Sequence, residues 1–331
     1  MTNLLPLTDT FGRVHNNLRI SVTDRCNLRC TYCMPEDVTF LPKDDLLTFE
    51  EIAALVRVAV PLGVDKVRLT GGEPLLRRGL PALVALLRDI PGLIDIGLTT
   101  NGILLAQQAD ALASAGLKRV NVSLDTLDPG RFRELTRRDG VEQVIGGLLA
   151  AKRAGFDRIK VNAVAIRGFI ERDLAPLAHF CRDHGFELRL IEYMPIGAEA
   201  WERGKVVPAH ELLELLEAQV APLSPAADYD PAAPAMDFVY ADTGAKLGII
   251  ASVSRPFCDR CNRLRVTADG KLRNCLFALD ELDVKPLLRP TLRPEELASA
   301  LRSNVRAKWA GHQFNTANFV KPDRTMHSIG G

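Results

Sequence analysis

Three cysteines near the start of the chain, Cys26, Cys30 and Cys33, are separated by three and then two residues. Three thiolates can hold three corners of a cubane iron–sulfur cluster and leave the fourth iron open to another ligand. A structural zinc site would need a fourth Cys or His, and the nearest candidate, His15, lies well upstream. The spacing therefore predicts a reactive 4Fe-4S cluster.

A second set of three cysteines, Cys258, Cys261 and Cys275, lies far away in the sequence. The seventh cysteine, Cys181, falls on an apolar helical stripe and is expected to be a core residue. An odd number of cysteines and a start without a basic and then apolar leader argue against a disulfide framework. We therefore expect a cytoplasmic protein whose thiols remain available for metal.

The composition excludes several classes of partner. The chain has 331 residues, a formal net charge of +1 and 47% hydrophobic residues. No overall basic field would attract nucleic acid, and no apolar run reaches the ~18 residues that span a bilayer. We expect neither nucleic acid nor a membrane as a partner, so any anionic ligand must be held by a local cluster of cations.

The elements that must position these residues form a repeating pattern of a short β-branched run, a loop and a helical stripe. Strands that alternate with helices pair in parallel, which leaves either an open doubly wound sheet or a barrel. Six units are too few for a complete eight-fold barrel, and we expect a partial (β/α)6 TIM-type barrel whose strand ends meet at one mouth. The expected strands are 18–22, 66–70, 94–99, 119–124, 159–166 and 187–193.

A change of composition divides the chain near residue 220. The segment 220–236 contains four prolines among alanines and reads as a linker. We predict two regions, 1–220 for the partial barrel and 221–331 for a C-terminal module. The module would contain strands near 237–240 and 246–250, the second cysteine set and a helix that begins at Pro294.

The second expected strand ends in Thr70-Gly71-Gly72-Glu73-Pro74. Taken alone, this segment is consistent with an ordinary strand-exit turn. Beside an open iron it suggests a clamp for an amino acid, because the glycines let a ligand approach the backbone and Glu73 could accept an ammonium group.

The first cysteine set and the Gly-Gly-Glu-Pro turn together resemble the radical S-adenosylmethionine enzymes. Further segments resemble the GTP 3′,8-cyclase family of molybdenum cofactor biosynthesis, and the resemblance runs from about Asp9 to Gly331. These segments are Ser21-Val-Thr-Asp-Arg-Cys, Thr99-Thr-Asn-Gly, Asn121-Val-Ser-Leu-Asp, Ile191-Glu-Tyr-Met-Pro, Pro256-Phe-Cys-Asp-Arg-Cys-Asn-Arg-Leu-Arg and Gly330-Gly331.

The resemblance implies two 4Fe-4S clusters, one on each cysteine set, with S-adenosylmethionine on the open iron of the first and the guanine of GTP on the second. It implies that Tyr32, Gly72, Ser123 and Met194 line the S-adenosylmethionine site. It places Arg19, Arg68, Thr99, Lys160, Arg263 and Arg265 around GTP, and gives catalytic roles to Arg263, Arg265, Gly330 and Gly331.

The implied reaction converts GTP to (8S)-3′,8-cyclo-7,8-dihydroguanosine 5′-triphosphate. A 5′-deoxyadenosyl radical removes the hydrogen from C3′ of the ribose, and the ribose radical attacks C8 of the guanine. The implied partners are an electron donor such as flavodoxin or ferredoxin, the next enzyme, cyclic pyranopterin monophosphate synthase, and a second copy of the chain in a homodimer. The alternatives are a peptide-modifying radical S-adenosylmethionine enzyme with an auxiliary cluster and, less compatible with the repeated strand–helix units, a two-cluster electron carrier.

Overall fold

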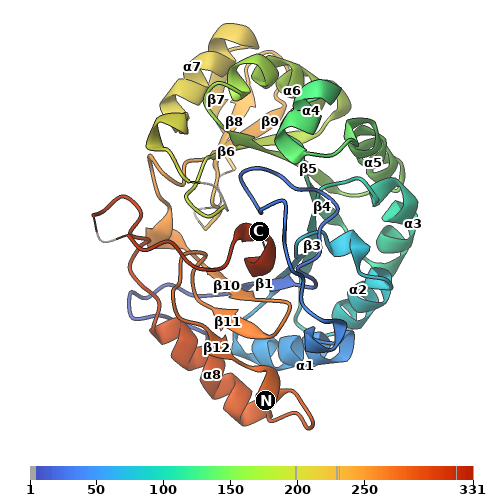
Figure 1. Ribbon diagram of the computed structural model, residues 1–331, viewed down its shortest axis with the longest axis vertical. Helices are drawn as coiled ribbons and strands as arrows, with labels where there is room; N and C mark the ends of the chain where they lie inside the picture. Colours follow the sequence, from blue (N-terminus) through green and yellow to red (C-terminus); the bar gives the residue numbers. More distant parts are fainter. Residues whose placement is uncertain (1–4, 198–199, 229, 231, 318, 331) are drawn as a thin grey trace.

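The computed structural model describes residues 5–197, 200–228, 230, 232–317 and 319–330. Its central feature is a run of six parallel strands that neighbour one another in chain order and curve around the C-terminal segment (Figure 1). The strands are β1 (Asn17–Ser21), β2 (Lys66–Thr70), β3 (Asp95–Thr100), β4 (Arg119–Ser123), β5 (Arg158–Ala165) and β6 (Glu187–Glu192). The six strands predicted from the sequence are therefore present, and most of their ends lie one residue from the predicted end.

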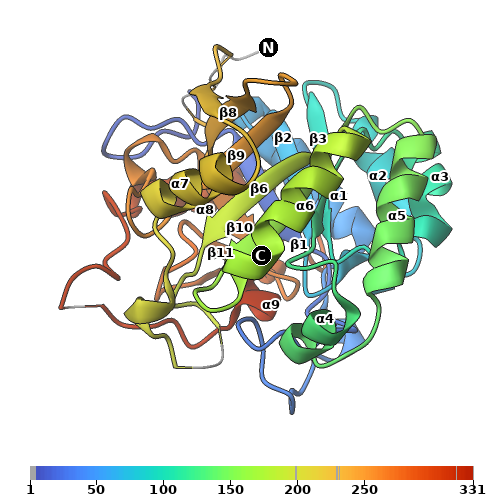
Figure 2. The ribbon, with the colours of Figure 1, turned by 90° about the horizontal axis from the view of Figure 1, so that it is seen from above.

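Helices connect these strands and cover the outer, convex face of the sheet (Figures 1 and 2). They are α1 (Phe49–Ala59), α2 (Leu80–Arg88), α3 (Leu105–Ala115), α4 (Pro129–Thr136), α5 (Val141–Arg153) and α6 (Ile170–His184). Thr48 and Glu51 form a capping box at the start of α1. Cys181 on α6 is 1% exposed and packs in the main core, as predicted.

Side chains alternate along the strands and so separate the core from the concave face. On β5, Ile159, Val161 and Ala163 are buried in the main core. Arg158 and Lys160 alternate with these residues along the strand and line a cavity on the opposite side of the sheet. The same alternation places charged side chains from several strands on one concave wall.

The remaining elements follow β6. They are α7 (Ala209–Gln219), α8 (Pro294–Arg306), α9 (Met326–Ile329), β7 (Leu223–Pro225), β8 (Met236–Tyr240), β9 (Lys246–Ile250), β10 (Arg263–Val266), β11 (Lys271–Arg273) and β12 (Leu282–Asp283). Single-turn 3₁₀ helices are η1 (Lys43–Asp45), η2 (Val60–Leu62), η3 (Pro74–Leu76), η4 (Arg203–Lys205), η5 (Cys258–Arg260) and η6 (Lys285–Leu287).

The strands after residue 220 extend the six-stranded sheet at both of its edges. β10 pairs in parallel with β1, and β9 pairs in parallel with β6. β11 and β12 continue one edge in antiparallel fashion, β8 and β7 the other, and the result is one mixed sheet of twelve strands. A strand at an open edge carries unpaired backbone groups, so each edge of the six-strand run offers a template for pairing.

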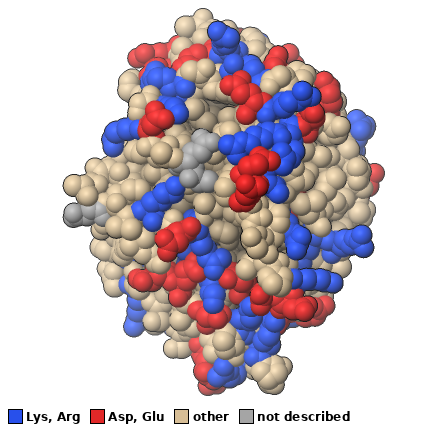
Figure 3. All heavy atoms as spheres, viewed as in Figure 1, with Lys and Arg blue, Asp and Glu red and all other residues tan. Residues whose placement is uncertain are grey.

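The described residues contain no helix with the length and apolar character needed to cross a bilayer. On the face seen in Figure 3, Lys and Arg side chains are intermixed with Asp and Glu. The positive charges that matter for the site lie inside the curve of the sheet.

Candidate active site

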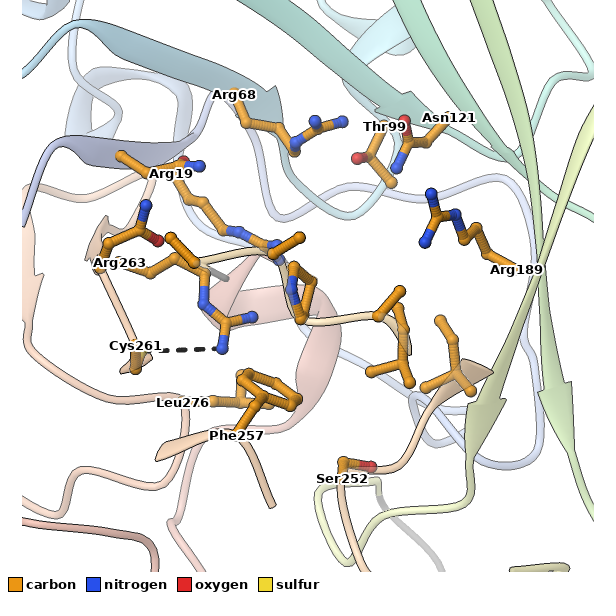
Figure 4. A pocket seen from close by; sticks show the side chains of 18 of the residues that line it. Arg19, Arg68, Thr99, Asn121, Arg189, Ser252, Phe257, Cys261, Arg263 and Leu276 are labelled. Carbon is orange, nitrogen blue, oxygen red and sulfur yellow. Dashed lines mark hydrogen bonds between the residues drawn. The ribbon is translucent and has the colours of Figure 1, made fainter. Parts of the chain in front are cut away.

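A cavity of about 490 Å³ lies against the concave face of the sheet (Figure 4). All six residues predicted to bind the nucleotide line it: Arg19, Arg68, Thr99, Lys160, Arg263 and Arg265. The second cysteine set and Met194 line the same cavity. The structure thus gathers residues from five strands and three connecting segments around one space.

The strand register explains how these side chains meet. Arg19 on β1 is paired with Arg265 on β10 on one side and with Arg68 on β2 on the other. Thr99 on β3 is paired with Asn121 on β4, and Asn121 is paired with Lys160 on β5. Parallel strands in register place such residues at one level of the sheet, which forms two polar rows across the cavity wall.

Arg19 and Arg68 have no carboxylate or carbonyl partner among the described residues. Arg19 Nε and Arg68 Nη1 are both buried without a hydrogen-bond partner. Burial and the neighbouring Arg119 lower the pKa of Arg68 to about 10. Burial and the nearby arginines likewise lower the pKa of Arg19 well below its usual value. A buried, unpaired guanidinium is costly, so this pair is suited to an anionic ligand.

Lys160 lies in a crowded group of cations. Its Nζ is 3.2 Å from Glu187 Oε1, but Arg189 pairs with the same carboxylate oxygen and also with Asp237. Burial, followed by the charges of Arg189 and Arg158, lowers the pKa of Lys160 to about 6. Near neutral pH the lysine is therefore ready to take up a proton when an anion enters.

Several residues on the cavity wall are not among those predicted from the sequence. Arg189 points into the cavity from β6, where it alternates with the buried Leu188 and Leu190 (Figure 4). Lys66 on β2, Arg119 on β4 and Arg158 on β5 line the cavity in the same way. A charged residue between apolar neighbours in a predicted strand is the signal that could have identified them.

The second cysteine set is assembled from three short segments. Cys258 begins η5, Cys261 precedes β10, and Cys275 follows β11. Arg263 Nη2 is 3.6 Å from Cys261 Sγ, and the Arg263 guanidinium lies 4.5 Å from the centre of the Phe257 ring. Burial by itself would raise the pKa of Cys261, but Arg263 and Lys308 lower it to about 6. Three free thiols beside fixed cations are a donor set that fits an iron–sulfur cluster.

The first cysteine set lies on the loop that follows β1. Cys26 Sγ is 3.4 Å from Leu28 N and 3.8 Å from Asn101 Nδ2, which follows β3. Burial raises the pKa of Cys26 to about 11 and that of Cys33 to about 12. Three thiol donors again fit a cluster, and binding must displace their protons. In the described part of the chain no three His, Cys, Asp or Glu side chains are grouped closely enough to hold a single metal ion. A cubane does not need such a group, because each thiolate binds a different iron.

The residues predicted to line the S-adenosylmethionine site are placed around this loop. Tyr32 donates a 2.8 Å hydrogen bond to Asp125 Oδ2, two residues beyond Ser123 at the end of β4. Gly72 packs against the loop so closely that a Cβ there would lie 2.5 Å from the carbonyl oxygens of Asp24 and Arg25. Met194, after β6, is the member of this set that also lines the nucleotide cavity.

The C-terminal segment lies at the centre of the curve in Figure 1. The carbonyl oxygen of Gly330 accepts a 2.6 Å hydrogen bond from Arg265 Nη1. Met326 lines the cavity, and Ile329 belongs to the same small apolar cluster as Cys275. Gly330 is therefore placed at the site, whereas Gly331 lies outside the described residues.

Glu73 differs from the expectation that it would bind an ammonium group. Its side chain is completely buried, and both carboxylate oxygens are already used. Oε1 accepts from Leu75 N and Thr100 Oγ1, at 2.9 and 2.7 Å, and Oε2 accepts from Asn101 N at 2.6 Å. The carboxylate joins the ends of β2 and β3, so any amino-acid clamp at this turn would have to use the backbone.

Sequence profiles of known families match nearly the whole chain. The Radical SAM superfamily matches residues 20–181, and Molybdenum Cofactor Synthesis C matches residues 186–314. The GTP 3′,8-cyclase of Rhodopirellula baltica is 47% identical over 336 residues, which cover 100% of this chain and 94% of the relative. That of Streptomyces coelicolor is 46% identical and covers 98% of this chain and 96% of the relative.

Solved structures share the fold at low sequence identity. Streptococcus suis SuiB bound to S-adenosylmethionine matches with a TM-score of 0.60 and 19% identity, over 90% of this chain and 68% of SuiB. The anSMEcpe structure with bound AdoMet matches with a TM-score of 0.57 and 18% identity, over 85% of this chain and 79% of that one. The full-length identity to the cyclases is much higher and does not favour the peptide-modifying alternative. The chain therefore belongs to the GTP 3′,8-cyclase family of the radical SAM superfamily.

Proposed function

We propose that the chain binds GTP in the concave cavity and converts it to (8S)-3′,8-cyclo-7,8-dihydroguanosine 5′-triphosphate, the first step of molybdenum cofactor biosynthesis. The observation that carries this proposal is a pair of half-buried arginines, Arg19 and Arg68, each with a buried guanidinium nitrogen that has no hydrogen-bond partner. They line the same cavity as Cys258, Cys261 and Cys275. One cavity thus contains both cations that could bind a polyphosphate and thiols that could bind a cluster.

We infer a partial six-unit barrel that holds the first cluster and S-adenosylmethionine within residues 1–220, and a second cluster held by residues 221–331. When bound, the first cluster and S-adenosylmethionine would supply the 5′-deoxyadenosyl radical that takes hydrogen from C3′. The chain itself has to hold the ribose still and exclude water, because a primary radical reacts with whatever lies nearest.

Each group of residues has a separate task in this proposal. Arg19, Arg68 and Lys160 bind the phosphates, and Thr99 offers a hydroxyl to the polar part of the nucleotide. Tyr32, Gly72, Ser123 and Met194 contact S-adenosylmethionine. Arg263 Nη2 lies 3.6 Å from Cys261 Sγ, and Arg265 donates to the carbonyl oxygen of Gly330. These contacts support a catalytic role for both arginines and Gly330, and we assign the same role to Gly331.

We further propose an acidic one-electron donor such as flavodoxin or ferredoxin, and delivery of the product to cyclic pyranopterin monophosphate synthase. A homodimer also remains part of the proposal. The cytoplasm, where thiols stay reduced, is the compartment in which both cysteine sets could bind iron.

Anaerobic reconstitution tests the two-cluster assignment. Two cubanes should give roughly eight irons per chain. Cys275→Ala should retain roughly four, whereas Cys181→Ala, a change at the buried cysteine outside both sets, should retain all of them. Zinc in place of iron, or an iron content that is the same in the two variants, would contradict the assignment.

Incubation of the reconstituted protein with GTP, S-adenosylmethionine and dithionite tests the reaction, with products identified by mass spectrometry. In Arg263→Ala plus Arg265→Ala, we expect S-adenosylmethionine cleavage to continue while formation of the cyclised nucleotide is lost. The reason is that both arginines line the nucleotide cavity, whereas the first cysteine set lies on a different loop. Unchanged cyclisation in this double variant would refute the roles given to the two arginines.

A further inference from the structure

A short hairpin at residues 7–15, outside both family matches, packs against the second cysteine set. It is closed by backbone hydrogen bonds from His15 N to Leu7 O, 2.8 Å, and from Asp9 N to Arg13 O, 3.1 Å. Asp9 and Arg13 are only 6% and 8% exposed. Charged side chains are seldom buried so deeply without a structural task.

Arg13 joins three carbonyl groups with its guanidinium. Nη1 donates to the carbonyl oxygens of Cys258 and Ala310, at 2.5 and 2.7 Å, and Nη2 donates to that of Trp309 at 2.7 Å. Asp9 holds the guanidinium in place, because Asp9 Oδ2 accepts a hydrogen bond from Arg13 Nε. The rigid planar fork of an arginine is suited to holding several acceptors at fixed positions.

Lys308, just after α8, joins the other two segments of the cysteine set. It is 5% exposed, and its Nζ donates to the carbonyl oxygen of Arg263 at 2.9 Å and to that of Asn274. Lys308 and Cys261 line the same cavity. Arg263 follows Cys261 by two residues, and Asn274 immediately precedes Cys275.

These contacts supplement the backbone hydrogen bonds of the cysteine segments, such as the one from Cys261 N to the carbonyl oxygen of Cys258 at 3.3 Å. Cys258, Cys261 and Cys275 lie on a single-turn helix and at strand ends, so carbonyl oxygens near them lack the regular partners of a sheet. Asp9 balances the charge of Arg13, but in the described part of the chain no carboxylate pairs with Lys308. The excess positive charge is therefore directed at the three sulfurs, as a set of thiolate ligands would require.

We infer that Asp9, Arg13 and Lys308 form a buried clamp that positions Cys258, Cys261 and Cys275 to receive the second cluster. This inference rests on the proposed function, which puts a cluster at that set. Arg13 fixes the Cys258 segment to the chain after α8, and Lys308 fixes the Cys261 and Cys275 segments to the same place. The three residues are positioning residues and contact neither substrate nor cofactor in this assignment.

Iron analysis after anaerobic reconstitution tests the clamp in the full-length chain. Arg13→Gln and Lys308→Met should each bind roughly four irons in place of roughly eight, because the first cysteine set is untouched. Arg306→Gln is the matched control, since Arg306 is an exposed cation two residues before Lys308. The control should bind roughly eight. Every variant should still cleave S-adenosylmethionine in the absence of GTP. That activity would show that the barrel is folded.

Alkylation of the metal-free proteins supplies a readout that needs no cluster. Iodoacetamide labelling followed by mass spectrometry should show Cys258, Cys261 and Cys275 reacting several-fold faster in the clamp variants, with Cys26, Cys30 and Cys33 unchanged. Arg13→Lys keeps the positive charge but not the planar fork of the guanidinium. We expect the cysteines of the second set to be labelled faster in this variant as well.

The outcomes separate the clamp from the proposed function. If Arg13→Gln, Arg13→Lys and Lys308→Met all bind as much iron as the control, with unchanged labelling, the clamp is overturned. If the unsubstituted chain itself binds only roughly four irons, the second cluster is wrong, and the labelling result then decides the clamp as a purely structural device.

Discussion

At the scale of single residues, the concave face carries more cationic side chains than carboxylates that could pair with them. Arg19 and Arg68 have no partner among the described residues, while Lys160 competes with Arg189 for the carboxylate of Glu187. Burial of such groups costs folding free energy that only an incoming anion can offset. Removal of one of these unpaired cations should therefore stabilise the ligand-free protein and weaken binding of the ligand.

Replacement of Arg68 by Met should separate these two effects. We expect the free energy of unfolding of the ligand-free protein to rise by about 1 kcal/mol or more, because a buried unpaired charge is removed. GTP should bind at least about tenfold more weakly, because a charge-assisted contact to phosphate is lost. Urea unfolding and equilibrium binding measure the two quantities. Arg57→Met, at an exposed site on α1, should change neither, and a destabilised Arg68→Met would contradict this account.

Lys160 should make GTP binding depend on pH. Its pKa is lowered to about 6 in the empty site and should rise when phosphate lies beside it. Binding therefore takes up a proton above pH 6, and affinity should fall as pH increases from 6 towards the higher pKa of the complex. Calorimetry in two buffers of different ionisation enthalpy would measure roughly one proton taken up.

The control for this titration is Lys160→Arg, because arginine stays charged throughout the pH range. That variant should lose the proton uptake that belongs to the lysine and retain only the part that GTP itself contributes. Equal proton uptake in the two proteins would show that Lys160 is already charged in the empty site.

At the scale of elements, the carboxyl ends of the strands are fastened to one another by buried polar side chains. Glu73 joins the turn after β2 to the backbone after β3. Tyr32 joins the first cysteine loop to Asp125, whose Oδ1 accepts from Val164 N on β5 at 2.7 Å. The loops that surround the site are thus held in place by contacts between neighbouring strand ends.

Glu73→Gln tests whether this carboxylate is structural. An amide cannot accept all three hydrogen bonds, so the variant should unfold with a free energy lower by about 1–3 kcal/mol. Binding of S-adenosylmethionine to the folded variant should change much less. Denaturant unfolding and S-adenosylmethionine binding should be compared in the same preparation. Loss of binding with unchanged stability would restore the interpretation that Glu73 accepts the ammonium group.

At the scale of the whole molecule, residues after 220 complete both edges of one sheet. β10 covers β1 and β9 covers β6. The same core also takes Leu264, Leu297 and Leu301 from the C-terminal third of the chain. The site requires this arrangement, because Arg263 and Arg265 reach the cavity only as part of a strand added beside β1.

A fragment of residues 1–220 should consequently fail to fold on its own. Its two outer strands would expose unpaired backbone groups, and the core would lose the apolar side chains of β10 and α8. We expect an aggregated product without cooperative thermal unfolding, whereas the full chain unfolds cooperatively. A soluble fragment with a sharp transition would instead support an independent barrel domain, the division predicted from the change in composition.

The sequence determined the local features of this protein. Short β-branched runs marked the six parallel strands, and Cys181 was assigned to the core from its helical stripe. The spacing of the cysteines identified both cysteine sets, whereas the six cavity residues were implied by the resemblance to the cyclase family. Each of these depends on neighbours close in the chain, so the pattern is visible without tertiary structure.

Only the tertiary structure decided which distant residues share a site. Nothing in the local sequence indicates that β10 pairs with β1, that Arg13 reaches Cys258, or that both oxygens of Glu73 are already occupied. Arg189 lies between two leucines of a predicted strand, which is a local signal, but only the packing of the sheet shows that its side of β6 faces the cavity. Strand pairing and burial are long-range properties, and they determine whether a charged side chain meets a partner, a ligand or solvent.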